Sequence, residues 1–288
     1  MNDINEKNIL SFQSRGILYE HKSPIIMGIM NCTPDSYYAE SRYTQVEQAL
    51  DRVGNMLEQG LTMLDIGGQS TRPGAEPVLA QEEMDRILPY VEALIHHYPQ
   101  LFVSIDTYQS QVARHALELG AHCINDISAG TLDPAMLKVV SEYKVPYVIM
   151  HMQGNPQTMQ IQPKYQSVVT DIIRYLAERK QVCQEWGIQD IWVDPGFGFG
   201  KTLEQNYQIF NQLHAIRTLL DAPLLVGISR KSMIYKLLNI TPQESLSATS
   251  ALHLQALMQG AQILRVHDVK EASEVLQLYK QLQNTESL

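Results

Sequence analysis

Short apolar runs alternate with longer amphipathic segments along almost the whole chain. One amphipathic segment, 44–59, places Val46, Leu50, Val53 and Leu57 on a single face, as an α-helix requires. The apolar runs have the length of buried strands and lie at 25–31, 62–68, 102–107, 122–128, 147–152, 191–197, 224–229 and 262–268. The pattern therefore predicts eight strands and eight helices in alternation.

The strand pattern also predicts how the elements assemble. Gly60, Gly120 and Gly187 each follow a predicted helix, where a left-handed C-terminal cap belongs. Strands that are apolar throughout are buried on both faces, which is typical of a parallel sheet. Eight βα units of this length favour an α/β fold, a (β/α)8 TIM barrel over about 25–285. An open doubly wound sheet is the alternative, because the pattern gives connectivity and not closure.

The rest of the chain suggests no further domain. Residues 1–22 precede the first strand and are expected to form a short hairpin over the barrel floor. No linker or low-complexity segment interrupts the pattern, so we expect one domain over 1–288.

Composition narrows the range of partners. The chain has 288 residues, 44% of them hydrophobic, and a formal net charge of −9. Such a surface is expected to repel nucleic acid and anionic membranes, so an anionic ligand would need a local cationic cluster. The three cysteines are widely spaced, and neither a signal peptide nor a membrane span is recognisable. We therefore expect a cytoplasmic protein with reduced thiols that binds small molecules.

Polar residues stand at the end of every predicted strand. In a (β/α)8 barrel the carboxyl ends of the strands meet at one mouth, where active sites form. Taken singly, Asp106 or Asp126 could cap a helix and His151 could be a core histidine. The strand-end residues are Asn31; Asp65, Gly67 and Gly68; Asp106 and Thr107; Asn125 and Asp126; His151; Asp194; Ser229, Arg230 and Lys231; and Arg265, His267 and Asp268.

The stretch IWVDPGFGFGKT (191–202) resembles a nucleotide phosphate loop at first sight. That motif, Gly-x-x-x-x-Gly-Lys-[Ser/Thr], would need its first glycine at position 195. The residue there is Pro195, which has no N–H to offer to a phosphate. The glycines of this stretch therefore need another explanation.

The residue types at the strand ends indicate their chemistry. Asp106, Asn125 and Asp194 suit a flat heterocycle with a guanidine-like edge, which donates paired N–H bonds. Four cationic residues could hold a phosphate or pyrophosphate, and Asn31 beside them points to Mg²⁺ that keeps several waters. No nucleophile–base pair stands out, so we expect electrostatic stabilisation of a leaving group. The cationic residues are Arg72, Lys231, Arg265 and His267.

The strand-end motifs resemble those of the dihydropteroate synthases of folate biosynthesis, from about residue 25 to 275. DPGFGFGK is similar to the turn that binds the pterin in that family, with Asp194 on the pterin edge. The motifs are MGIMNCTPDS (27–36), DIGGQSTRPG (65–74), SIDTY (104–108), NDIS (125–128), MHMQGNPQTMQ (150–160), VDPGFGFGK (193–201), GISRKS (227–232) and RVHDV (265–269).

The resemblance implies a reaction and roles for individual residues. A dihydropterin-CH2-diphosphate would lose pyrophosphate as the amine of p-aminobenzoate attacks the methylene, giving 7,8-dihydropteroate. It also implies that the chain is a sulfonamide target and a homodimer. By motif position, Asn31 would bind Mg²⁺; Thr71, Asp106, Asn125, Asp194 and Lys231 would line the pterin pocket; Arg265 and His267, with Arg72 nearby, would hold the pyrophosphate; and Tyr37, Arg72, Pro73 and Ser232 would border p-aminobenzoate. Asn31, Lys231, Arg265 and His267 would then be the catalytic set.

The chain departs from the family pattern at three places. The first loop reads TPDSYYAES, so Tyr37 replaces Phe, Ala39 replaces Asp, and Glu40-Ser41 replace a glycine pair. Gln69 stands where Glu is usual, and Ala129 interrupts a Ser-Gly-Gly sequence. These positions bear on p-aminobenzoate binding, loop movement and turnover.

Three alternative functions can be weighed against the sequence. A catalytically weak homologue that only binds pterin would explain the atypical first loop. A pterin-dependent methyltransferase would share the barrel, although the SRKS and RVHD motifs suit a pyrophosphate that such enzymes lack. A non-enzymatic scaffold would have no use for so many polar strand ends. Pyrophosphate release with both substrates and Mg²⁺ discriminates among them.

Overall fold

The computed structural model describes residues 10–32, 42–70, 74–155, 157, 159 and 163–285. Among these residues, eight parallel strands form one sheet in the order β8-β7-β6-β5-β4-β3-β10-β9. A parallel bridge between Val193 and Leu224 joins the two ends of that order, so the sheet closes into the predicted barrel. The strands are β3 (Ile25–Asn31), β4 (Met63–Gly67), β5 (Phe102–Asp106), β6 (Cys123–Asp126), β7 (Tyr147–Met150), β8 (Ile191–Asp194), β9 (Leu225–Val226) and β10 (Ile263–Val266).

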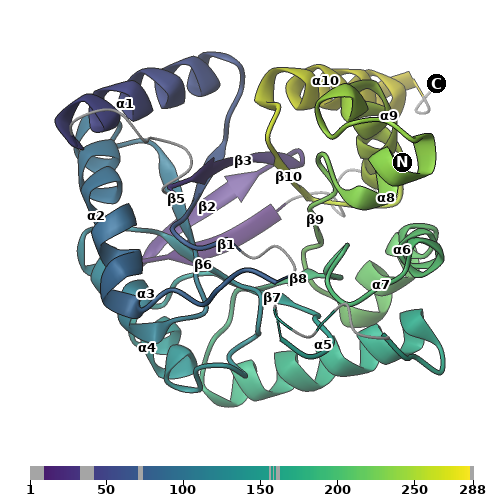
Figure 1. Cartoon of the computed structure of the whole chain (residues 1–288), viewed down its shortest axis with the longest axis horizontal. Coiled ribbons are helices and arrows are strands. Elements are labelled where there is room, and N and C mark those ends of the chain that lie inside the picture. The colour runs from purple at the N-terminus through teal and green to yellow at the C-terminus, as the bar shows by residue number, and fades with distance from the viewer. Residues whose placement is uncertain are drawn as a thin grey trace.

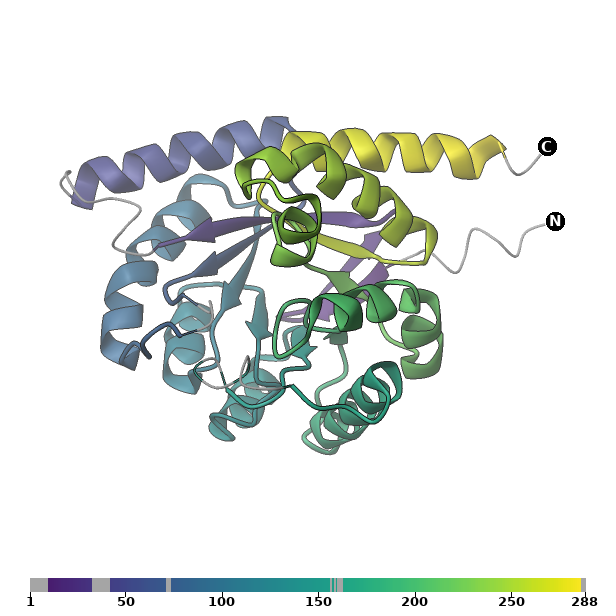
Figure 2. The same cartoon turned by 45° about the vertical axis from the view of Figure 1, so that its right-hand side comes forward.

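Helices follow the strands and form a ring outside the barrel (Figures 1 and 2). The prediction of eight strands is confirmed, but that of eight helices is wrong, because the described chain has ten. They are α1 (Arg42–Glu58), α2 (Ala80–His97), α3 (Ser110–Glu118), α4 (Ala135–Tyr143), α5 (Val168–Glu185), α6 (Leu203–Phe210), α7 (Leu213–Leu220), α8 (Ser232–Leu238), α9 (Leu246–Met258) and α10 (Val269–Thr285).

The two extra helices arise where the segments after β8 and β9 each divide in two. After β9, Asn239 ends α8 in the left-handed conformation with φ 54°, and Pro242 begins a short 3-10 turn before α9. Asn and Pro are ordinary signals for such a break. After β8, α6 ends at Phe210 and α7 begins at Leu213, and no glycine or proline marks the division.

An N-terminal hairpin closes the amino ends of the strands, which we call the floor. It consists of β1 (Leu10–Ser14) and β2 (Ile17–His21), and Figure 1 shows it lying across the middle of the ring. Phe12 lies against Trp192 and Phe102 with ring centroids 5.0 and 5.3 Å apart. The floor cluster consists of Leu10, Phe12, Ile25, Met27, Met63, Phe102, Cys123, Val148, Trp192, Leu225 and Ile263. The predicted hairpin is thus confirmed over 10–21.

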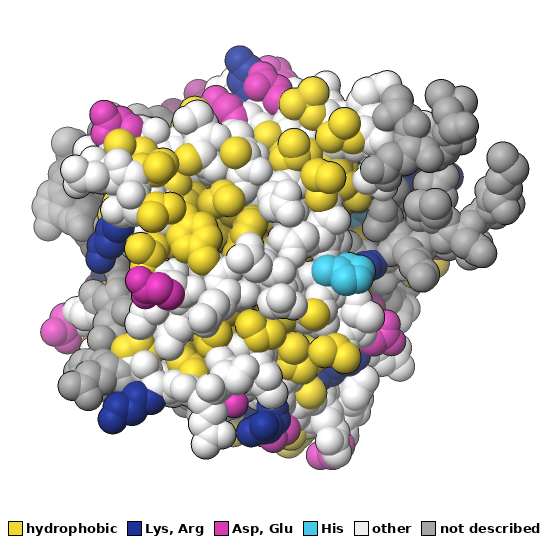
Figure 3. All heavy atoms as spheres, turned by 90° about the vertical axis from the view of Figure 1, so that its right-hand side faces the viewer, with side chains coloured by type: hydrophobic (Ala, Val, Ile, Leu, Met, Phe, Trp, Pro, Cys, Tyr) yellow, Lys and Arg dark blue, Asp and Glu magenta, His cyan; other side chains and the backbone are white. Residues whose placement is uncertain are grey.

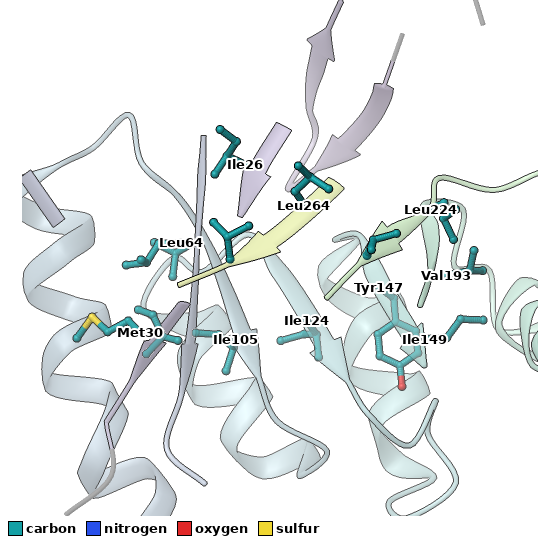
Figure 4. Packing of buried hydrophobic residues seen from close by; sticks show 14 of the residues in the cluster. Ile26, Met30, Leu64, Ile105, Ile124, Tyr147, Ile149, Val193, Leu224 and Leu264 are labelled. Carbon is teal, nitrogen blue, oxygen red and sulfur yellow. The ribbon is translucent and has the colours of Figure 1, made fainter. Parts of the chain in front are cut away.

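The outward-facing strand residues form a second core between the barrel and its helices. Alternate residues of a strand point to opposite faces, so the neighbours of the floor residues face the helices. Figure 4 shows this layer with Ile26, Met30, Leu64, Ile105, Ile124, Ile149, Val193 and Leu264.

The predicted left-handed caps are present. Gly60, Gly120 and Gly187 have φ of 101°, 113° and 81°, a region that side chains with a β-carbon rarely adopt. No helix in the described ranges is long and apolar enough to cross a membrane.

Candidate active site

Strand alternation places the candidate site directly above the floor. Moving two residues along a strand keeps the side chain on the same face, so Met63 is followed inside the barrel by Asp65, and Trp192 by Asp194. By the same step, Ile263 is followed by Arg265. In each of these three strands, the side chains that point into the barrel therefore change from apolar to charged over a step of two residues. The charged layer lies at the carboxyl ends of the strands, which we call the mouth.

A buried ion-pair network joins four strands at the mouth. Arg265 of β10 donates from Nε to Asp65 Oδ2 at 2.7 Å and from Nη2 to Asp106 Oδ2 at 2.6 Å. Asn125 Nδ2 donates to the same Asp65 oxygen at 2.9 Å. Asp65 is fully buried, and its other oxygen has no hydrogen-bond partner among the described residues. Within the described part of the chain, the network therefore leaves one carboxylate oxygen of Asp65 unpaired inside the barrel.

Burial and charge pairing act against each other in this network. Burial raises the pKa of Asp106 to about 7, with Asp65 adding to the rise and Arg265 opposing it. Burial also tends to lower the pKa of Arg265, but Asp65 and Asp106 together raise it above its usual value. Arg265 therefore stays a fixed cation, while Asp106 sits near the point where a proton from solution or ligand changes its charge.

Asp194 and Lys231 lie beside the network. A β-carbon added at Gly227 would lie 3.8 Å from Arg265 Cβ and 3.9 Å from Asp194 Oδ2, so both side chains pass this glycine. Burial raises the pKa of Asp194, whereas the Gly196 N–H, Lys231 and Arg265 act in the opposite direction. Lys231 Nζ lies 4.4 Å from the centre of the Phe199 ring, in cation–π range.

The glycine-rich turn after β8 is built by close backbone approach. Gly196 donates its N–H to Asp194 Oδ1 at 2.7 Å and has φ 73°. A β-carbon there would come within 2.0 Å of the His151 carbonyl oxygen, so only glycine fits. Lys201 is 4% exposed and points back to backbone carbonyls of the turn. The rejection of a phosphate loop is consistent with this orientation.

His267 lies at the edge of the same cationic group. Its Nδ1 is 3.2 Å from Ser229 Oγ, and its backbone N–H donates to the same oxygen at 3.2 Å. Burial, together with the nearby Arg265 and Arg230, lowers the pKa of His267 to about 4. Neutral His267 can offer one N–H to an anion at neutral pH. Arg230 itself pairs with Asp268.

The remaining predicted site residues are only partly within the described chain. Asn31 ends β3 with an exposed side chain, opposite Gly67 of β4, and Ser232 is the first residue of α8. The described residues contain no group of three or more His, Cys, Asp or Glu that could hold a metal ion. The predictions for Tyr37, Thr71, Arg72 and Pro73, and for the loop residues Ala39, Glu40 and Ser41, lie outside the described residues.

The sequence interpretation gave no role to three buried residues near the site. Asp65 was recognised as a strand-end polar residue but not as the partner of Arg265. Lys201 was treated as the end of a glycine turn. Glu83 of α2, 1% exposed, accepts a hydrogen bond from Gln109 beside the Asp106 strand end. Asp65 could have been found, because a carboxylate inside the apolar run MLDIG needs a buried partner.

Two strand-end residues make structural contacts: His151 is buried, as the simpler interpretation allowed, whereas Asp126 binds a turn and does not cap the next helix, whose N-cap is Pro134. Asp126 accepts hydrogen bonds from the Ser128 N–H at 2.7 Å, the Gly130 N–H at 2.9 Å and the Tyr147 hydroxyl at 2.6 Å. It therefore fixes the turn after β6. His151 is a buried ring whose Nδ1 lies 3.1 Å from Lys201 Nζ.

Comparisons with known proteins agree with this arrangement. Residues 27–267 match the model of a family described as pterin binding enzyme. The chain is 42% identical over 267 residues to the dihydropteroate synthase of Escherichia coli, covering 92% of this chain and 94% of that protein. A dihydropteroate synthase of Yersinia pestis, in a sulfonamide drug complex, superposes with a TM-score of 0.88 at 41% identity, over 96% and 100% of the two chains.

A second solved structure extends the likeness. The dihydropteroate synthase of Xanthomonas albilineans, solved with 4-aminobenzoic acid, has a TM-score of 0.87 at 37% identity and covers 95% of this chain and 98% of its own. The family match spans the barrel and the motifs that form its mouth. On these findings, the chain belongs to the family of pterin-binding enzymes.

Proposed function

We propose that this chain condenses (7,8-dihydropterin-6-yl)methyl diphosphate with p-aminobenzoate, releasing pyrophosphate and forming 7,8-dihydropteroate. The likeness to dihydropteroate synthases over nearly the whole chain supports this reaction. The observation that carries it is the network of Arg265 with Asp65 and Asp106, beside Asp194 and Lys231, because it offers both carboxylates and fixed cations in one mouth.

The carboxylates of Asp106 and Asp194 and the amide of Asn125 suit binding of the pterin ring. A pterin carries a guanidine-like edge with N–H donors, and a carboxylate accepts two such bonds in parallel. Asp194 is our candidate for this contact, with Asp106, Asn125 and Lys231 completing the pocket. Thr71 is assigned to the same pocket from its motif position.

The cations suit the leaving group. As the bond between the methylene carbon and the diphosphate oxygen breaks, negative charge grows on pyrophosphate, and preorganised donors stabilise it. Neither ion pair of Arg265 uses Nη1, so that nitrogen is our candidate donor. Neutral His267 would add one N–H, and Lys231 and Arg72 would add charge. The amine nitrogen of p-aminobenzoate forms the new bond to the methylene and gives up one of its two protons to the departing pyrophosphate or to solvent.

We assign Mg²⁺ to the diphosphate end of the site. Magnesium keeps several waters and often uses one or two protein oxygens with substrate phosphates. The exposed Asn31 side chain at the mouth fits that limited role. When bound, the ion would neutralise phosphate charge. Asn31→Ala is expected to raise the Mg²⁺ concentration needed for tight diphosphate binding, measured by titration calorimetry without p-aminobenzoate.

The second substrate is assigned to the edge of the mouth. Tyr37, Arg72, Pro73 and Ser232 are our candidates for bordering p-aminobenzoate. Ser232 directly follows Lys231 at the start of α8, so its position suits a ring placed next to the methylene. Sulfonamides are expected to bind there too, since a related structure holds such a drug.

We also propose that two copies pair through the face formed by α8, α9 and α10. Hydrophobic side chains gather on this side of the molecule (Figure 3). Helix α9 (LSATSALHLQALM) carries no Asp, Glu, Lys or Arg on any face, which is typical of a helix that is covered. The exposed large side chains there are Leu237, Leu238, Met258, Leu278 and Leu282. Light scattering is expected to give a dimer mass, and Met258→Glu to give a monomer.

The three buried cysteines form no disulfide, which suits the reducing cytoplasm, where we propose that the chain works.

The reaction is tested by mixing the protein with the dihydropterin diphosphate, Mg²⁺ and p-aminobenzoate and measuring pyrophosphate and dihydropteroate. Both products are expected in equal amounts. Pterin binding without either product would instead indicate a binding homologue or a methyltransferase.

A further inference from the structure

Lys201 is a buried lysine that reaches back into the turn it follows. Its Nζ lies 2.7 Å from the Gly196 carbonyl oxygen, 2.9 Å from that of Phe199 and 3.2 Å from that of His151. The fourth neighbour is His151 Nδ1 at 3.1 Å. An ammonium group has three N–H donors, so four acceptors surround three protons.

These contacts hold the turn in the shape that the pterin site requires. The Gly196 N–H binds Asp194 Oδ1, and the Phe199 ring lies beneath Lys231 Nζ. Lys201 binds the carbonyl oxygens of the same two turn residues, Gly196 and Phe199. Through Gly196, Lys201 therefore supports the position of the Asp194 carboxylate, and through Phe199 it supports the position of the Lys231 ammonium group.

Stability alone gives little reason for a lysine at this position. Burying a charged amine is costly unless hydrogen bonds satisfy it, and an apolar residue of similar volume often serves a core at least as well. Gly196, Gly198 and Gly200 have positive φ, and the single ammonium group of Lys201 satisfies the carbonyls of Gly196 and Phe199 in this turn. The arrangement suits a turn whose backbone must be held in one conformation.

We propose that Lys201 is a positioning residue of the pterin site, which holds the turn 195–200 so that Asp194 and Phe199 face the pterin ring. This inference rests on the proposal that Asp194 binds the pterin. Lys201 itself does not touch the substrate in this scheme. It acts through the Gly196 and Phe199 carbonyls, and His151 must keep its proton on Nε2 while its Nδ1 accepts.

The same arrangement makes the turn sensitive to pH. Burial lowers the pKa of Lys201 to about 7, Asp194 opposes that shift, and Lys231 adds to it. The groups that face the amine are His151 after β7, Asp194 of β8 and Lys231 before α8. A neutral amine keeps two donors, so at least one turn contact is lost as pH rises through about 7. Pterin affinity is expected to fall over the same range.

The test measures binding of the dihydropterin diphosphate by calorimetry, without p-aminobenzoate so that no turnover occurs. Lys201→Met is expected to weaken binding about tenfold or more, the consequence of losing at least one hydrogen bond to a charged group. Lys180→Met is the matched control, because Lys180 also donates to two carbonyls, of Leu220 and Asp221, but far from the mouth. The control is expected to keep its affinity within about twofold.

A merely structural Lys201 would give a different pattern. In that case Lys201→Met would lower the melting temperature but leave the affinity of the folded protein unchanged, which overturns the inference. Asp194→Asn separates the two proposals. If that variant binds normally, the site assignment fails; if it binds weakly and Lys201→Met binds normally, only the role of Lys201 fails.

The pH dependence and the wild-type chain give two further readouts. From about pH 6 to about pH 7.5, wild-type affinity is expected to fall more than that of Lys201→Met, in which Asp106 of the same pocket still titrates. If Lys201→Met does not fold, NMR of wild-type protein labelled at lysine Nζ replaces it. The buried Lys201 signal is expected to shift when the dihydropterin diphosphate binds, and that of Lys180 to stay. An unchanged Lys201 signal would overturn the inference.

Discussion

The two ends of the barrel use the same strands for opposite purposes. At the floor, β8 contributes Trp192 to an apolar cluster that the hairpin covers; two residues later the same strand contributes Asp194 to the charged mouth. Likewise β4 provides Met63 below and Asp65 above. The floor cluster is made of apolar side chains that pack on one another, whereas the mouth holds carboxylates and cations that need one another or a ligand.

The comparison teaches that stability and function are separated along the strand axis. Floor side chains remove apolar surface from water and need no partner of specific chemistry. Mouth side chains are buried at a cost in solvation, which their ion pairs offset only partly. Substitutions at the floor should therefore lower the free energy of unfolding, and substitutions at the mouth should lower ligand affinity or kcat/KM.

Phe12→Ala should have the largest effect on stability. The ring is 2% exposed and contacts Trp192 and Phe102, so its loss leaves a cavity in the floor. We expect the free energy of unfolding to fall by about 3–5 kcal/mol, measured by chemical denaturation. The kcat/KM of the folded protein should stay unchanged. A large loss of kcat/KM at unchanged stability would break the separation between the two ends.

Arg265→Ala should have the largest effect on catalysis. Removing this fixed cation should lower kcat/KM by roughly 100- to 1000-fold, the usual cost of losing one preorganised donor. Because the lost group does not titrate near neutrality, lowering the pH should not restore activity. The control is Arg114→Ala, whose partner Glu142 lies on the surface. Normal turnover of Arg265→Ala with Mg²⁺ present would mean that other groups hold the pyrophosphate.

Asp194→Asn should weaken pterin binding by about 1.5–3 kcal/mol, because the amide loses the charge and one acceptor. Asp190→Asn is the matched control. Asp190 lies at the floor end of the same strand and accepts a hydrogen bond from the Gln13 N–H of the hairpin at 3.0 Å. Calorimetry should show a loss for Asp194→Asn alone. Equal losses in both variants would remove the distinction between the ends.

Ala129→Gly should produce the smallest change, and in the stabilising direction. Ala129 follows β6 at the mouth and has φ 52°, where a β-carbon is unfavourable. Relief of that strain, less the entropy that glycine adds to the unfolded chain, should raise stability by up to about 1 kcal/mol. Ala177→Gly on the exposed side of α5 should do the opposite. Thermal unfolding of both variants measures the difference, and a destabilised Ala129→Gly would contradict the strain.

The alternation of apolar runs was enough to predict the barrel, because buried parallel strands are apolar on both faces. All eight strands lie where that pattern placed them, and the cap glycines have the expected φ. The division between α6 and α7 was not predicted: Asn211 lies there, but it keeps a right-handed conformation with φ −70° and is not a left-handed cap, so tertiary packing decides. Closure by the Val193–Leu224 bridge is likewise a tertiary property.

The site was predictable as a list of residues but not as a network. Position at a strand end placed Asp106, Asn125, Asp194 and Arg265 at one mouth, and the structure agrees. Which carboxylate pairs with which cation depends on side-chain reach across the barrel. Arg265 and Asp65 are 200 positions apart, and periodicity along one strand says nothing about such pairs.

The packing of the floor hairpin gives the chain a built-in optical probe. The chain has two tryptophans: Trp192 is 1% exposed and packs against Phe12, and Trp186 at the end of α5 is 48% exposed. Trp192 should emit at short wavelength and resist acrylamide, while Trp186 should emit at long wavelength and be quenched. In Trp186→Phe the remaining tryptophan fluorescence would report on the hairpin and the strand ends that it covers. A shift of the Trp192 emission to longer wavelength during denaturation would show when the hairpin separates from the barrel.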